Sequence, residues 1–220
     1  MTSSYKVLIF DWDGTIMDSV ANICASLQSA IDELSALPKT YEEQRNVIGL
    51  GLSEAVLALY PEASPEFVDA FSEAFRDHFL FRNDTPSPLF EQVEPILADL
   101  QSDGYDMAIA TGKSRRGLDK VLNESGLKDY FPVNYCAEET FSKPHPKMLE
   151  EILIDHNIKA SRALMIGDTE YDMQMAVNAN MHGLAATFGV HSRERLALHK
   201  PVGFVDAFSQ IPEWLHNNER

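Results

Sequence analysis

The chain has 220 residues, of which 45% are hydrophobic and 24% are charged. This is enough for one large domain or for a core domain with a smaller companion. Its formal net charge is −16, which argues against nucleic acid or an anionic membrane surface as the main partner. The same charge repels anions, so any site for an anionic ligand needs a metal ion or local cations that reverse the sign of the field.

The two cysteines, Cys24 and Cys136, are far apart and form no metal-binding pattern. We expect both to be reduced thiols packed in the core. No secretory signal is visible, and no segment approaches the ~18 consecutive apolar residues of a membrane span. These features predict a cytoplasmic protein, either a monomer or a homodimer.

The first predicted element is a buried strand that ends in two carboxylates. Residues 6–10 are mostly apolar, and Asp11, Asp13 and Gly14 follow them. Ligands of open α/β sheets bind beyond the carboxyl ends of the strands, so Asp11 and Asp13 should face a crevice. Their spacing lets both side chains point the same way. Two adjacent carboxylates repel each other, and a bound divalent cation relieves that repulsion.

The next stretch, residues 18–82, changes to a helical pattern and contains no convincing strand. Apolar spacing predicts helices over residues 20–34, 41–47, 54–60 and 65–82. Ser19 and Ser53 are the expected N-caps of the first and third of these helices. A stripe of phenylalanines is expected to form the core of the block and not a cofactor site: Phe67, Phe71, Phe75 and Phe79.

A polar linker rich in proline, residues 83–88, follows the helices, and its hinge partner is expected just after Thr15. Helices and strands then alternate. Strands are predicted over 107–110, 134–137, 163–166, 183–188 and 204–205, and helices over 93–100, 114–126, 146–155 and 173–181. This alternation predicts an α/β protein with a Rossmann-like parallel sheet core and helices on both faces. The core should comprise residues 1–16 and 87–220, and residues 17–86 should form an inserted α-helical domain.

Polar groups stand at four successive strand ends. They are Asp-x-Asp-Gly-Thr at 11–15, Thr111, Lys143-Pro144 on a loop, and Gly-Asp-x-x-x-Asp at 167–172. Each motif alone is weak, but in this order and spacing they resemble the haloacid dehalogenase-like hydrolase superfamily over nearly the whole chain. The helical insertion resembles the small cap domain of the phosphoglycolate phosphatase-like branch. The resemblance implies a phosphatase of small phosphorylated metabolites, such as phosphoglycolate-like or sugar-phosphate-like monoesters.

The resemblance also implies the chemistry of the first motif. Asp11 would be the nucleophile that forms an aspartyl-phosphate. Asp13 would act as general acid toward the leaving alkoxide and then as general base for water. A Mg²⁺ cofactor would be held by the carboxylates of Asp11 and Asp168 and by the backbone carbonyl of Asp13.

The later motifs would bind the phosphate. Thr111 and the amide of Gly112 would donate hydrogen bonds to the phosphoryl oxygens at a helix N-terminus. Lys143 would place a cation beside the same oxygens, oriented by Asp168 or Asp172. Asp172 fits a supporting role behind the metal ligands better than direct ligation.

The helical insertion is expected to select the substrate. Gly49 and Gly51 flank the loop best able to approach the core, because glycine permits close backbone contact. Lys113 should counter the negative field near the phosphate. Two alternatives remain for Arg45: it contacts an anionic group of the substrate, or it is a surface residue exposed to solvent.

Other functions of the same motifs can be weighed. Asp13 argues against haloalkanoate dehalogenases, which lack the second carboxylate as an acid. Lys39 is the one lysine available for the Schiff base of phosphonate-cleaving members, and nothing around it supports that role. A phosphomutase of the same superfamily, a phospho-receiver module and a catalytically idle phosphate-binding relative stay as alternatives.

Overall fold

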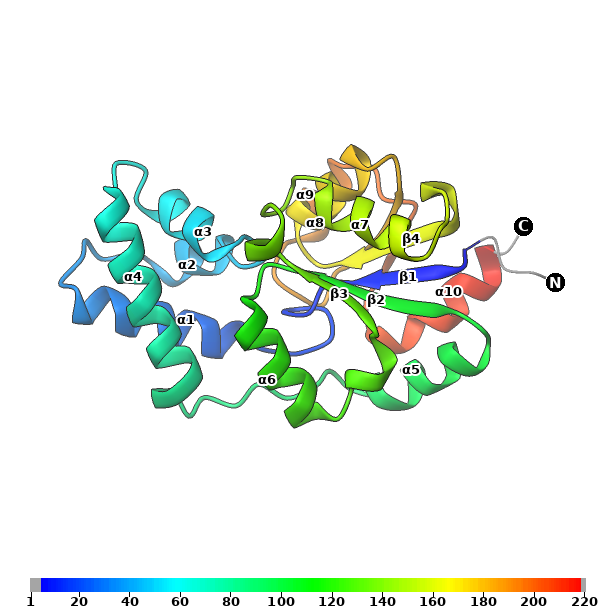
Figure 1. The fold of residues 1–220 in the computed structure, drawn as a ribbon, viewed down its shortest axis with the longest axis horizontal. Coiled ribbons are helices and arrows are strands. Elements are labelled where there is room, and N and C mark those ends of the chain that lie inside the picture. The colour runs from blue at the N-terminus through cyan, green and yellow to red at the C-terminus, as the bar shows by residue number, and fades with distance from the viewer. Residues whose placement is uncertain (1–4, 219–220) are drawn as a thin grey trace.

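The computed structural model describes residues 5–218, and a six-stranded parallel sheet forms its centre (Figure 1). The strand order is β3-β2-β1-β4-β5-β6. The strands are β1 (Val7–Phe10), β2 (Asp106–Thr111), β3 (Val133–Cys136), β4 (Ala163–Gly167), β5 (His182–Ala186) and β6 (Gly203–Val205). β1 pairs with β2 on one side and β4 on the other, so the chain leaves β1 at the middle of the sheet's carboxyl edge.

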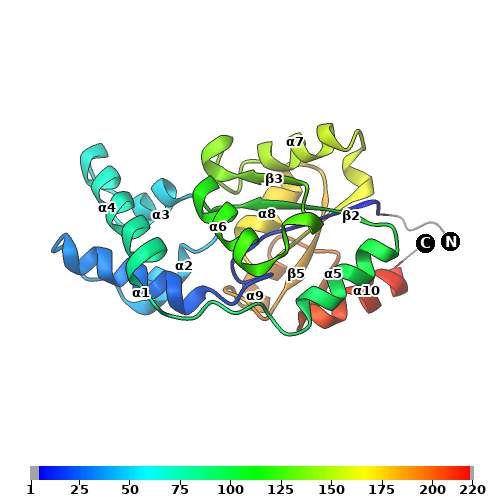
Figure 2. The same ribbon diagram turned by 60° about the horizontal axis from the view of Figure 1, so that its bottom comes forward.

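Helices cover both faces of the sheet, as predicted, because alternate residues of each strand point to opposite sides. Leu8 and Phe10 pack with α5 (Val93–Ser102), α6 (Arg115–Ser125) and α10 (Ile211–Asn218). Val7 and Ile9 pack with α7 (Lys147–Asp155) and α8 (Glu170–Asn178) on the other side. Figure 2 shows α7 on one side of the strands and α5 and α10 on the other.

Short elements complete this part of the chain. They are α9 (Arg193–Ala197) and the 3-10 turns η2 (Lys128–Tyr130), η3 (Ala137–Glu139), η4 (Ala160–Arg162) and η5 (Phe208–Gln210). No helix among residues 5–218 is both long enough and apolar enough to span a bilayer. The predicted core segments also include residues 1–4 and 219–220, which lie outside the described residues.

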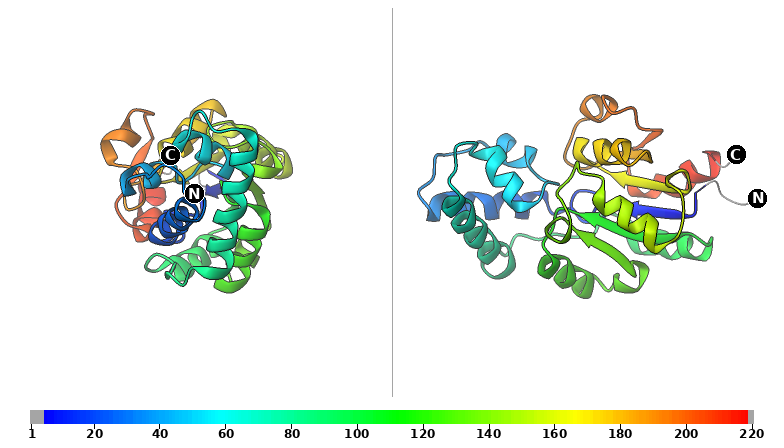
Figure 3. Two further views of the ribbon diagram at one scale, coloured as in Figure 1. Left: turned by 90° about the vertical axis from the view of Figure 1, so that its left-hand side faces the viewer. Right: turned by 45° about the horizontal axis from the view of Figure 1, so that its top comes forward.

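The remaining helices form one group beyond the carboxyl edge of the sheet, at the opposite end from both termini (Figures 1 and 3). We call residues 20–82 the helical block. It contains α1 (Val20–Glu33), α2 (Tyr41–Asn46), α3 (Leu52–Leu59), α4 (Pro65–Asp77) and the π-helix η1 (His78–Arg82). The block has its own buried cluster, centred on residues such as Leu27, Val56 and Phe71. The phenylalanine stripe packs against or within this cluster.

The chain crosses between sheet and helical block along two adjacent segments. Met17 bridges Asp13 on one side and Leu89 on the other. The Asp18 amide donates to the Pro88 carbonyl at 2.8 Å, and the Phe90 amide donates to the Ile16 carbonyl at 3.0 Å. The linker therefore pairs with the stretch after Thr15, as predicted.

Several predicted boundaries are corrected. α3 begins at Leu52 with Gly51 at the N-cap position, so Ser53 lies inside the helix and does not cap it. α8 begins at Glu170 and not at 173, because Thr169 and Asp172 form a reciprocal capping box. Ser19 stands at the N-cap of α1, but its hydroxyl makes no capping hydrogen bond.

Candidate active site

Asp11 follows β1 directly and has a buried cation as its partner. Its side chain is 1% exposed. Lys143 reaches it from the loop before α7, with its Nζ atom 2.7 Å from Asp11 Oδ1 and 2.7 Å from Asp172 Oδ1. Burial alone would lower the pKa of Lys143, but the carboxylates of Asp11 and Asp172 outweigh it and raise that pKa. Lys143 is therefore a fixed positive charge beside Asp11.

Asp168 follows β4, which is the neighbour of β1. Its Oδ1 accepts a hydrogen bond from the Thr15 hydroxyl at 2.8 Å, and its Oδ2 accepts one from the Val190 amide at 2.7 Å. Gly14 makes this approach possible. Its φ is +80°, and a Cβ there would lie 2.2 Å from Asp168 Oδ2. Glycine is required at position 14 for both its conformation and its size.

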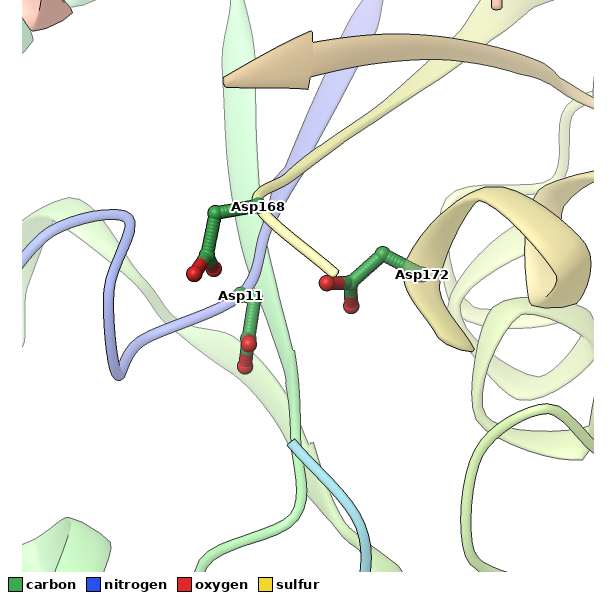
Figure 4. A group of neighbouring side chains, drawn as sticks. All are labelled: Asp11, Asp168 and Asp172. Carbon is green, nitrogen blue, oxygen red and sulfur yellow. The ribbon is translucent and has the colours of Figure 1, made fainter. Parts of the chain in front are cut away.

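Asp11, Asp168 and Asp172 form a compact acidic group (Figure 4). Each offers a carboxylate oxygen, and these oxygens lie within 4.8 Å of one another. Burial raises the pKa of Asp11 well above its usual range, and the charges of Asp172 and Asp168 add to this, although Lys143 opposes it. Among the described residues, Asp11 Oδ2 is buried and accepts no hydrogen bond. Three carboxylates around one lysine, with an oxygen left free, fit a second, divalent cation.

The contacts of Asp172 distinguish it from the other two carboxylates. Its Oδ1 contacts Lys143, and its Oδ2 accepts from the Thr169 amide at 3.0 Å and the Thr169 hydroxyl at 2.6 Å. Both oxygens are thus engaged within the protein. Asp172, and not Asp168, is the residue that orients Lys143. A supporting position for Asp172 behind the expected metal ligands stays a prediction.

Asp13 has a separate set of contacts. The Ser19 hydroxyl donates to Asp13 Oδ1 at 2.5 Å, and Lys113 Nζ lies 2.9 Å from the same oxygen. Lys113 also lies under the Phe79 ring of the helical block, 4.5 Å from the ring centroid. Sequence reasoning assigned Ser19 to helix capping and so missed its contact with Asp13.

Thr111 and Gly112 lie where β2 ends, beside the residues that follow β1. Thr111 is 1% exposed, and its hydroxyl accepts a hydrogen bond from the Lys113 amide at 3.2 Å. A Cβ on Gly112 would lie 2.4 Å from the Leu50 carbonyl oxygen. The absence of a side chain at Gly112 therefore lets the loop of the helical block pack directly on the sheet edge.

Gly49 and Gly51 do lie against the sheet domain. A Cβ on Gly49 would lie 3.1 Å from the Thr169 side chain, and the Gly51 amide donates to the Ser142 hydroxyl at 2.7 Å. The loop between them is therefore one face of the boundary between the helical block and the sheet.

A cavity of about 220 Å³ lies at this boundary. Asp11 and Asp13 line it from the sheet side together with Gly112 and Lys113, and Gly49 and Gly51 line it from the helical block. Thr111, Lys143 and Asp168 are buried and do not line it. Among the described residues, the two aspartates of the first motif are thus the buried carboxylates that line the cavity.

Two other basic residues, Arg45 and Lys39, make contacts away from the cavity. The Arg45 guanidinium donates to the Gly189 carbonyl at 2.7 Å. Lys39 lies 3.7 Å from a Glu43 oxygen and over the Tyr60 ring. Neither lines the cavity. The backbone amide of Val190, which binds Asp168, was also missed, because any residue supplies such a donor and the sequence gives no signal for it.

Comparisons with known proteins identify the family of the chain. The family model for haloacid dehalogenase-like hydrolases matches residues 8–186. The chain is 32% identical to "Probable phosphatase IndB" of Dickeya dadantii, over 93% of this chain and 91% of that one. It is 27% identical to "Phosphoglycolate phosphatase" of Vibrio parahaemolyticus, over 94% and 95% of the two chains.

Solved structures show the same fold. A haloacid dehalogenase-like family hydrolase from Streptococcus pneumoniae superposes with a TM-score of 0.84 at 22% identity, covering 96% of this chain and 98% of that chain. A hydrolase from Pseudomonas syringae gives 0.87 at 20% identity, with 98% and 100% covered. The chain therefore belongs to the haloacid dehalogenase-like hydrolase family and is a phosphatase of its phosphoglycolate phosphatase-like branch.

Proposed function

We propose that this chain is a Mg²⁺-dependent phosphatase that hydrolyses small phosphate monoesters through an aspartyl-phosphate on Asp11. One observation carries the proposal: Asp11 lines a cavity with Asp13, has an unpartnered oxygen, and lies 2.7 Å from a buried lysine. A phosphate dianion approaches a carboxylate only where nearby cations neutralise the charge. Both relatives are named as phosphatases, and the name of one, "Phosphoglycolate phosphatase", supports a small monoester as substrate.

The proposed chemistry has two halves. Asp11 attacks phosphorus, the bond from phosphorus to the ester oxygen breaks, and Asp13 gives its proton to the departing alkoxide. Asp13 then takes a proton from a water molecule, whose oxygen attacks phosphorus and releases phosphate and free Asp11. Lys143 balances the charge of Asp11 and the phosphoryl oxygens throughout. Thr111 and the Gly112 amide are proposed to donate hydrogen bonds to those oxygens.

The residues proposed to hold Mg²⁺ are the Asp11 and Asp168 carboxylates and the Asp13 backbone carbonyl. When bound, the ion would neutralise charge on the phosphoryl group and the nucleophile. Thr15 and the Val190 amide hold Asp168 in place for this role, at 2.8 Å and 2.7 Å. The carboxylate-rich, oxygen-only donor set is typical of Mg²⁺ and other hard cations.

We further propose that residues 17–86 act as a cap domain over the site. The contact of its 49–51 loop with Gly112 and Ser142 supports this, because both partners belong to the sheet domain. Closure of such a cap would exclude bulk water while the ester reacts. A cytoplasmic location is proposed with it, in keeping with two buried free cysteines.

The test is phosphate release from an aryl phosphate, with Mg²⁺ and with EDTA, by the native protein and Asp11→Asn. We expect release that needs Mg²⁺ and disappears in Asp11→Asn, whose circular dichroism should match the native protein. Release that survives in Asp11→Asn would overturn the assignment of the nucleophile. Transfer of the phosphoryl group to a sugar phosphate in place of water would identify a mutase.

A further inference from the structure

The cavity over Asp11 and Asp13 has an apolar wall on the side that faces the helical block. That wall consists largely of six side chains from its loop and helices: Ile48, Leu50, Leu52, Phe75, Phe79 and Leu80. The leaving group of a bound phosphate ester must occupy the space between this wall and the two aspartates. Burial of an apolar group there favours binding, because apolar surface is withdrawn from water. Burial of a charged group opposes binding, because the group loses its hydration.

Among the described residues that line this space, none offers a free buried counter-charge to a charged group. Lys113 is the buried cation in the lining, and its ammonium already contacts Asp13 at 2.9 Å. Arg76 also lines the cavity but is exposed to solvent, where an ion pair contributes little. Within residues 5–218, the cavity lining therefore offers no free buried cation for a second anion.

Negative charge at the opening of the cavity also disfavours a negatively charged leaving group. Glu54 and Glu138 line the cavity and are exposed, so they lie at its solvent side. The whole chain carries a net charge of −16, which repels a substrate more strongly the more negative it is. The phosphate itself is compensated by Lys143 and the proposed metal ion, but a carboxylate on the leaving group is not.

Resting on the phosphatase function proposed above, we infer that the leaving group of the natural ester is an uncharged, largely apolar alcohol of metabolite size. A cavity of about 220 Å³ has room for a small alkyl or aryl group. By this inference, phosphoglycolate, whose carboxylate is separated from the ester oxygen by one methylene, is a poorer substrate than a neutral ester of similar length. The substrate of this chain then differs from the one in the names of several relatives.

Two substrate series test the inference on the native protein with Mg²⁺. In the n-alkyl phosphates from methyl to hexyl, leaving-group basicity changes little, so kcat/KM reports binding of the chain. It should rise about fourfold per methylene until the cavity is full. Phenyl phosphate should exceed 4-carboxyphenyl phosphate by about tenfold, and propyl phosphate should exceed phosphoglycolate.

A substitution in the apolar wall tests whether this wall causes the preference for uncharged esters. Leu80→Lys places an ammonium in the lining and should shift the preference toward 4-carboxyphenyl phosphate by about tenfold. Leu57→Lys makes the same charge change at a residue of α3 that is 43% exposed and does not line the cavity, so its preference should stay native. The folding of both variants is checked by circular dichroism. If Leu80→Lys fails to fold, the two substrate series on the native protein still test the inference.

The outcomes separate the two proposals. A native protein that releases phosphate but prefers carboxylated esters, or shows no rise with chain length, overturns this inference alone. An equal shift in both lysine variants would overturn the assignment of selectivity to the cavity wall. Release from no ester at all would overturn the proposed function and this inference with it.

Discussion

The Lys113 ammonium lies 2.9 Å from Asp13 Oδ1 and is 6% exposed in its side chain. The same ammonium lies against the face of Phe79, which belongs to the helical block. A lysine of the sheet domain thus contacts both the proposed acid and base and the proposed cap. The contact with Asp13 lies within the sheet domain, and the contact with Phe79 joins the same ammonium to the helical block.

Removing this lysine should slow catalysis more than it weakens binding. Lys113→Met takes from Asp13 its charged partner, a contact worth about 1.5–3 kcal/mol, so kcat should fall by roughly 10- to 100-fold. Lys113→Arg should recover part of the loss. Lys120→Met makes the same charge change at an exposed residue of α6 paired with Glu124, and it should behave like the native enzyme. A native kcat in Lys113→Met would show that the contact with Asp13 does not matter.

The stabilisation of the protein by Mg²⁺ should grow with pH. Burial, with the charge of Asp172, raises the pKa of Asp168 to about 7. An unfolded aspartate ionises near pH ~4, so between about pH 4 and 7 the folded metal-free protein holds a proton that the unfolded chain has lost. The stability that this group contributes therefore falls as the pH rises through that window.

Magnesium competes with that proton. The increase in melting temperature on replacing EDTA with Mg²⁺ should be larger at about pH 8 than at about pH 5.5. Asp168→Asn, which lacks the titrating group and a proposed ligand, should show almost no increase at either pH. An increase that is the same at both pH values in the native protein would contradict the proposed ligand set.

Gly112→Ala should interfere with seating of the 49–51 loop. The added Cβ would lie 2.4 Å from the Leu50 carbonyl oxygen and 2.7 Å from that of Gly49. Because the conflict lies between the helical block and the sheet, we expect kcat/KM to fall at least about tenfold. The melting temperature should stay within a few degrees of native. Native kinetics in this variant would mean that the loop contact is not needed in the reacting state.

Lys143→Met should destabilise the metal-free protein strongly. It leaves Asp11 and Asp172 buried without their cation, and loss of one partner of a buried pair costs about 3–5 kcal/mol. Urea denaturation in EDTA measures the change in the free energy of unfolding. Lys147→Met, which removes a partly exposed pair with Glu151, should change the midpoint little. Equal midpoints for the two variants would contradict the role assigned to Lys143.

The strands, the inserted helices and the approximate order of site residues could be predicted from the sequence, because each depends on a local pattern. The run Val7 to Phe10 is buried on both faces, so its lack of alternation identified a central strand. Contacts between segments far apart in sequence could not be predicted this way. Nothing near Ser19 indicates that its hydroxyl turns back to Asp13 and leaves the α1 N-terminus uncapped.

The errors at α3 and α8 have a local cause. Ser53 and Thr169 are equally good capping residues by type, but only Thr169 has an acidic partner three positions later that completes a capping box. Asp172 was therefore placed before its helix, although it lies within the first turn. A capping-box search over residues 169–172 would have found the true start.

The two segments that connect the sheet to the helical block lie side by side at Met17, and this has a consequence for how the inserted domain can be replaced. The chain departs from the sheet and returns to it along adjacent segments, one bridged to Asp13 and both joined through Met17 and Leu89. Any insert whose two ends fit that narrow gap can replace the present one without disturbing the strand order. If the helical block selects the substrate, as proposed, a new insert changes the substrate while the residues proposed for phosphate chemistry stay on the sheet.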